Sequence, residues 1–283
     1  MEAVTTTNPE TLLSTRDLIA VGVQGDDVRR RMHGAQTTFV RVLELQVGAI
    51  PAARPAGLNA GEFRIVGTPD TEALAIVAVK AGAALAQGAP LTGFSLADLQ
   101  ALAPDPDALA GLCSRLHDAG LEAIAEVPLD RLDEPASAVH AARDAGLGVW
   151  RLTVHNLADD GRIASVERAR DLQGAVGGFK AFAPLPRVMS VTTPTTGYDD
   201  VKQVALARVV VTNIDSIQVD WPLYGPKLAQ VALTVGADDV DGISAVDPGL
   251  LGTRRSPIEE IKGNIRAAAL EAAERDGRFR LLA

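Results

Sequence analysis

The feature that most constrains the fold is a repeated alternation of short apolar runs with longer segments of helical periodicity. The runs have the lengths of buried strands. We expect strands at residues 39–47, 63–66, 91–94, 123–127, 149–154, 179–183, 217–220 and 240–244. Eight β-α units in series are typical of a parallel sheet closed into a (β/α)8 barrel of the TIM type, and a chain of 283 residues fits such a barrel.

Helix-start and helix-stop signals support the segments between the runs. Residues 17–32 are predicted as a helix that ends before Gly34, and Ser256, Pro257 and Glu259 form a capping box that opens a C-terminal helix. Further helices are expected at 71–86, 108–119, 136–145, 163–175, 199–211 and 227–235. The predicted organisation is a leader and helix over residues 1–36, followed by one barrel domain over residues 37–283.

A doubly wound open sheet is the main alternative fold. No glycine-rich phosphate-binding loop follows the first expected strand, which argues against it. Residues 48–61 instead contain two prolines and three glycines, which predicts a long first β-α loop.

Composition excludes several classes of function. The chain carries 27 basic and 36 acidic residues, a formal net charge of −9, and 4% aromatic residues, which is unsuited to a nucleic-acid surface. No apolar run is as long as a membrane span, and the first 14 residues lack the basic-then-apolar pattern of a signal peptide. We therefore expect a cytoplasmic protein that binds neither nucleic acid nor membrane.

Several motifs in fixed order carry a family resemblance. They are GFKAFAPLP at residues 178–186, TTGYDDVK at 195–202, GPKLAQVAL at 225–233 and GADDVDG at 236–242, with RRRMHG at 29–34 in the opening helix. Across residues 16–34 and 109–247 the chain resembles the radical S-adenosylmethionine enzymes of the futalosine route to menaquinone. These are aminofutalosine synthase and dehypoxanthine futalosine cyclase, which are related to the deazaflavin-cofactor synthases.

The chain departs from that family at the first β-α loop. The resemblance implies a three-cysteine motif there, holding a four-iron four-sulfur cluster that generates a radical from S-adenosylmethionine. Residues 48–54 contain neither cysteine nor histidine, and the one cysteine of the chain, Cys113, is expected in the core face of a helix. The cysteine count therefore excludes an iron–sulfur cluster. We expect no cofactor, and whether S-adenosylmethionine still binds stays open.

Barrel enzymes place their chemistry at the C-terminal ends of the strands. Glu126 lies near such an end, where a carboxylate is costly to bury without a partner. The segment around it is also similar to one near the active site of the family. His155 follows another strand and has the side chain that titrates near neutral pH. Ser95 is expected to cap a helix, since no complete nucleophile elbow surrounds it.

Asp239 and Asp241 alternate along the last strand and so share one face. Two neighbouring carboxylates can split their pKa values and perform acid–base work. We predict Glu126, His155, Asp239 and Asp241 as catalytic residues. No pair of His or acidic residues has a metal-ligand spacing, so no metal site is expected.

A second group of residues is predicted to bind substrate. Arg187 follows a strand and offers a planar donor fork to an anion, while Thr195, Thr196 and Tyr198 precede a helix whose N-terminal N–H groups can also bind one. Trp221 follows the next strand and can stack on a ligand ring. The alternative is that Arg187 pairs with a nearby Asp and Thr196 only caps its helix.

These observations predict a cluster-free barrel related to the menaquinone enzymes. It would bind a related carboxylated small molecule and use non-radical acid–base chemistry. The alternatives are a non-catalytic scaffold that pairs with an active paralogue or with itself, and a barrel enzyme of another chemistry. Polar side chains that converge in the barrel mouth would favour catalysis, whereas a mouth filled by residues 48–61 would favour a scaffold.

The cysteine count yields a direct prediction. After anaerobic reconstitution with iron and sulfide, the purified protein should show no iron–sulfide charge-transfer absorbance and no stoichiometric iron, because three cysteine ligands are lacking. Absorption spectroscopy and iron analysis measure both. About four iron atoms per chain would contradict the prediction.

Overall fold

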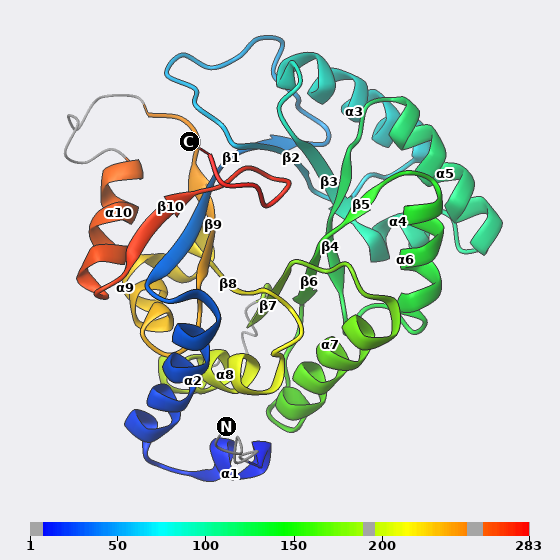
Figure 1. The fold of residues 1–283 in the computed structure, drawn as a ribbon. Coiled ribbons are helices and arrows are strands. Elements are labelled where there is room, and N and C mark those ends of the chain that lie inside the picture. The colour runs from blue at the N-terminus through cyan, green and yellow to red at the C-terminus, as the bar shows by residue number, and fades with distance from the viewer. Residues whose placement is uncertain (1–7, 189–195, 248–256, 283) are drawn as a thin grey trace.

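The computed structural model describes residues 8–188, 196–247 and 257–282, and a closed barrel of parallel strands forms its centre (Figure 1). The strands are β1 (Gln36–Gln46), β2 (Glu62–Val66), β3 (Leu91–Ser95), β4 (Ala123–Pro128), β5 (Gly148–Val149), β6 (Arg151–Val154), β7 (Ala181–Pro186), β8 (Ser216–Asp220) and β9 (Asp239–Ser244). β5 and β6 together form the fifth expected strand. β9 pairs with β1, which closes the sheet and confirms the predicted barrel.

Helices surround the barrel (Figure 1). They are α1 (Pro9–Ser14), α2 (Leu18–His33), α3 (Glu72–Ala86), α4 (Leu96–Leu102), α5 (Pro106–Asp118), α6 (Pro135–Asp144), α7 (Arg162–Val176), α8 (Gly197–Val210), α9 (Trp221–Leu233) and α10 (Pro257–Ala267), with a 3₁₀ turn at Asp159–Gly161. None of the helices within these ranges is both long and apolar enough to cross a bilayer.

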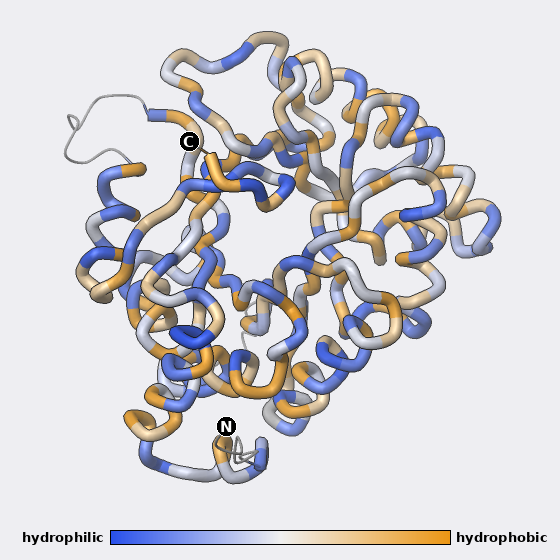
Figure 2. The backbone as a smooth tube through the Cα atoms, in the orientation of Figure 1, coloured by the Kyte–Doolittle hydropathy of each residue, from blue (hydrophilic) through white to orange (hydrophobic). Residues whose placement is uncertain are grey.

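The core lies between the strands and the inner faces of the helices. Orange and blue residues mix along most helices in Figure 2, as expected when one face of a helix is buried. At Gly82 in α3 an added Cβ would lie 3.2 Å from Leu91 Cδ1, so this glycine lets the helix approach the sheet closely. Cys113 is fully buried in α5, as predicted.

The connection between β1 and β2 contains no helix. Arg54 in this connection donates through Nε to the Leu85 carbonyl and through Nη2 to the Ala86 carbonyl, at the end of α3. Its guanidinium also lies 5.2 Å from the centre of the Phe63 ring. The predicted long loop is therefore held against the outside of the barrel.

The C-terminal segment adds a strand that the sequence did not predict. β10 (Glu271–Glu274) pairs in parallel with the first residues of β1. Arg275 then enters the barrel and donates to both oxygens of Asp239, at 2.6 and 2.7 Å. Both side chains are almost completely buried, so this pair fixes the C-terminal segment at the N-terminal end of the barrel.

Removal of one partner of this pair should destabilise the fold. Arg275→Met leaves the Asp239 carboxylate buried without its cation, which should lower the free energy of unfolding by about 3–5 kcal/mol. Arg278→Met is the matched control, because Arg278 pairs with Glu122 at a half-buried site and should cost less than about 1 kcal/mol. Urea denaturation measures both variants, and equal losses would contradict the prediction.

Candidate functional site

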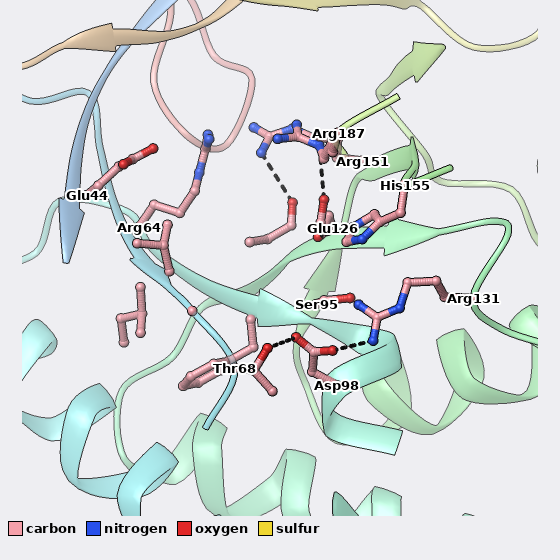
Figure 3. Close-up of a pocket in the computed structure, with 15 residues that line it drawn as sticks. Glu44, Arg64, Thr68, Ser95, Asp98, Glu126, Arg131, Arg151, His155 and Arg187 are labelled. Atoms are coloured by element: carbon pink, nitrogen blue, oxygen red, sulfur yellow. Dashed lines mark hydrogen bonds and ion pairs between the residues drawn. The ribbon is translucent and has the colours of Figure 1, made fainter. Parts of the chain in front are cut away.

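A cavity of about 390 Å³ opens at the C-terminal ends of the strands (Figure 3). Its volume falls in the range of small-molecule sites. The lining residues are Glu44, Arg64, Ile65, Val66, Gly67, Thr68, Phe94, Ser95, Asp98, Ala125, Glu126, Arg131, Arg151, His155 and Arg187. Seven of these fifteen residues carry charged side chains. Residues 48–61 are not part of it, so the first loop does not fill this mouth.

Three predicted site residues meet in the cavity. Glu126 lies in β4, His155 follows β6 and Arg187 follows β7. His155 Nε2 lies 2.7 Å from Glu126 Oε1, and Arg187 Nε lies 3.0 Å from Glu126 Oε2. This is the placement expected from their strand ends.

Their surroundings set the charge of Glu126. Burial raises the pKa of the Glu126 carboxyl, but the hydrogen bond with His155 and the positive charge of Arg187 outweigh burial and lower this pKa to about 2. Glu126 is therefore a carboxylate at neutral pH. Asp130 fixes the backbone of His155, since Asp130 Oδ1 accepts a hydrogen bond from the His155 backbone N–H at 2.7 Å.

A buried network of two arginines and two carboxylates lies beneath the cavity. Arg64 donates to both oxygens of Asp241, at 2.8 and 2.9 Å, and to Glu62 at 2.8 Å. Arg151 lies 3.5 Å from Asp241 and 3.7 Å from Glu62. Burial raises the pKa of Asp241, but Arg151 and Arg64 lower it far more, so Asp241 is ionised.

The expected pairing of Asp239 with Asp241 needs correction. Each carboxylate is bound by its own arginine, Asp241 by Arg64 and Asp239 by Arg275. Asp239 also accepts from Thr38 at 2.5 Å. Neither aspartate belongs to the lining of the cavity, so the structure offers no carboxylate pair that shares a proton there.

The outer rim of the cavity contains a hydrogen-bonded chain that the sequence analysis missed. Thr68 Oγ1 donates to Asp98 Oδ2 at 2.8 Å, and Arg131 Nη2 donates to Asp98 Oδ1 at 2.7 Å (Figure 3). Arg131 lies in a loop and carries no signal that marks it as a site residue. Arg64 and Arg151 could have been found, because a charged residue inside an apolar strand needs a buried partner.

Ser95 and the residue before it are also unusual. Phe94 has a φ of +62°, which costs about 1–3 kcal/mol for a side chain of this size. Ser95 occupies the position just before α4, but the predicted side-chain cap is wrong, because its hydroxyl makes no capping hydrogen bond. The Ser95 Oγ is buried and has no hydrogen-bond partner among the described residues.

The remaining predicted substrate-binding residues lie elsewhere. Thr196 caps α8 in a reciprocal capping box with Asp199, and the Tyr198 hydroxyl donates to the Arg16 carbonyl. Trp221 forms the first residue of α9, half-buried against the core, because Asp220 caps this helix earlier than expected. None of the three lines the cavity, and Thr195 lies outside the described residues.

Arg187 also differs from the expectation of a donor fork open to an anion. Besides Glu126, it contacts Asp220 through Nη1 at 3.3 Å. The alternative interpretation therefore describes the contacts of both residues. Arg187 pairs with a nearby aspartate, Asp220, and Thr196 caps its helix.

The side chains present do not fit a metal cluster. In the described part of the chain no three His, Cys, Asp or Glu residues are arranged to hold a metal ion. Burial raises the pKa of the Cys113 thiol to about 11, so it is a poor source of thiolate. One buried thiol does not match a cluster held by three cysteines.

The C-terminal part of the chain is similar to a known protein family. Residues 179–280 match the family described as the CofH/MqnC C-terminal region. An aminodeoxyfutalosine synthase from Streptomyces coelicolor is 32% identical over 143 residues, which cover 43% of this chain and 37% of that protein. A cyclic dehypoxanthine futalosine synthase from the same organism is 30% identical over 152 residues, covering 46% and 38%. The chain therefore aligns with less than half of either relative.

A solved structure extends the likeness of fold to nearly the whole chain. Methylornithine synthase (PylB) superimposes with a TM-score of 0.65 over 96% of this chain and 95% of that one. The two are 13% identical, so this likeness concerns the fold alone.

The lowered pKa of Glu126 yields a pH-dependent prediction. A carboxyl whose pKa falls from 4.5 to about 2 on folding stabilises the protein above pH 4.5, and this contribution is lost as the pH falls toward 2. The stability advantage of the wild type over Glu126→Gln should therefore shrink by about 1 kcal/mol between pH 7 and pH 4.

Urea denaturation of both proteins at the two pH values measures this difference. Glu72→Gln is the control, because Glu72 forms an exposed ion pair with Arg115. A difference that stays constant for Glu126→Gln would contradict the lowered pKa.

Proposed function

We propose that this chain, whose residues 179–280 match the CofH/MqnC C-terminal region, binds a carboxylated small molecule related to those of the menaquinone-pathway enzymes in the barrel mouth. We further propose that it acts on this molecule by proton transfer and without a radical, in the cytoplasm. The observation that carries the proposal is the Glu126–His155 pair, 2.7 Å apart in a polar cavity.

The pair has the parts that acid–base chemistry requires. The ionised Glu126 accepts from His155 Nε2, which assigns the proton of the neutral ring to that nitrogen and leaves Nδ1 as the base. His155 then takes a proton from the bound molecule at Nδ1, and the neighbouring carboxylate stabilises the imidazolium until the proton returns. Asp130 keeps the backbone of His155 in place during this exchange.

The open mouth favours this proposal over a scaffold. Ten of the lining residues are polar or charged, namely Glu44, Arg64, Thr68, Ser95, Asp98, Glu126, Arg131, Arg151, His155 and Arg187. A scaffold needs no such convergence of titratable groups, which is typical of catalytic sites.

Deuterium exchange tests the chemistry without knowledge of the net reaction. Aminodeoxyfutalosine, which the name of one relative contains, is incubated with the protein in heavy water, and mass spectrometry follows deuterium uptake at carbon. This probe should exchange with the wild type. His155→Gln should slow its exchange at least 100-fold, the usual scale of general-base catalysis.

His117→Gln is the matched control, since His117 lies half-exposed on α5, away from the cavity. Calorimetry on the same samples measures binding. The absence of both binding and exchange, or exchange that His155→Gln leaves unchanged, would overturn the proposal.

A further inference from the structure

Arg131 is the arginine of the cavity that the protein itself engages least. Its Nη2 donates to Asp98, and its side chain is 37% exposed. Arg64, Arg151 and Arg187 instead each contact at least two carboxylates. The donors of Arg131 that do not reach Asp98 are therefore available to a ligand.

Asp98 fixes the direction of this arginine. Its Oδ1 accepts from Arg131 and its Oδ2 accepts from Thr68, so both carboxylate oxygens are used. A carboxylate held at both oxygens has little freedom to rotate. Asp98 therefore acts as a positioning residue for the Arg131 guanidinium.

Ser95 supplies a second and independent observation. The residue is 7% exposed and its Oγ has no partner among the described residues. Ser95 pairs in register with Glu126 across β3 and β4, so both side chains point to the same face of the sheet, into the cavity. A buried hydroxyl without a partner is costly, and a ligand oxygen would satisfy it.

The arginines at the two sides of the cavity differ in how far they are engaged. Figure 3 shows Glu44 and Arg64 at one side, and Ser95 with Arg131 at the other. Arg64 is already paired with Glu62 and Asp241, whereas Arg131 is paired with Asp98. A carboxylate of the ligand is therefore attracted to the side that carries Arg131.

We propose that Ser95 and Arg131 form the subsite that binds a carboxylate of the ligand. The carboxylate accepts one hydrogen bond from the Ser95 hydroxyl and one or two from the Arg131 guanidinium. The rest of the ligand then extends along the wall that carries His155. This inference rests on the proposed function and adds which residues recognise the acidic group.

Benzoate and benzamide provide a matched pair of probes, since they differ in charge but hardly in shape. Titrations of isotope-labelled protein followed by NMR measure their dissociation constants. Wild-type protein should bind benzoate at least tenfold more tightly than benzamide. Arg131→Ala should remove most of this preference, and Ser95→Ala should reduce benzoate affinity about 3- to 10-fold.

Two further variants serve as controls. Arg131→Gln keeps a hydrogen-bond donor for Asp98, so it should lose the preference for benzoate while the contact with Asp98 is kept. This variant separates the loss of charge from the loss of structure. Arg115→Ala removes an exposed arginine outside the cavity and should change nothing.

Equal binding of the two probes by the wild type would overturn the subsite. A preference for benzoate that survives in both the Arg131 and the Ser95 variants would overturn it as well. Neither result would affect the deuterium-exchange test of His155, which measures proton transfer and not carboxylate preference. The failure of the subsite and the failure of the proposed function are therefore distinguishable.

Discussion

Four charged side chains inside the barrel must balance one another because they are almost completely buried. Arg64 and Arg151 face Glu62 and Asp241, and each of the four is at most 6% exposed. An isolated ion at such a site would cost several kcal/mol, whereas two cations with two anions satisfy each other. Because these residues come from β2, β6 and β9, their pairing also requires that the three strands keep their register.

Ion pairs also connect this buried network to the cavity above it. Arg187 Nη2 lies 3.9 Å from Asp241 Oδ2 in the network and its Nε lies 3.0 Å from Glu126, so it links the network to the acid–base pair. The positive charge of Arg187 is one of the causes that keep Glu126 ionised, and the ionised carboxylate in turn orients His155. Arg187 thus helps to keep Glu126 ionised, whereas the carboxylates of the network do not contribute to the lining of the cavity.

The sequence predicted the elements whose signals are local. Alternating apolar runs located the strands of the barrel. Glu126 near the end of one strand, and His155 and Arg187 after two others, were thereby placed at the same end of the barrel. β10 was not predicted because Glu271–Glu274 lacks the apolar pattern of a buried strand and forms a strand through its pairing with β1. Arg131 was not predicted because its position depends on residues distant in the chain. Asp98 lies 33 residues before Arg131, and Thr68 lies 30 residues before Asp98. Conversely, Thr196 and Tyr198 were predicted to bind substrate, although their hydroxyls can also make internal contacts, a helix cap for Thr196 and a hydrogen bond to the Arg16 carbonyl for Tyr198.

The first β-α connection departs from the cysteine motif that the family resemblance implies, although the barrel itself is closed. The connection has no cysteine and is held against the end of α3 through Arg54, outside the cavity lining. Apart from Glu44, Arg64 and Thr68, the polar groups of the mouth come from β3 and the segments that follow it. Any reaction at this mouth must therefore use strand ends and their loops, where a carboxylate, an imidazole and partly engaged guanidinium groups already converge. Side chains of these kinds transfer protons and bind anions, which is the physical basis of the acid–base chemistry proposed for this mouth.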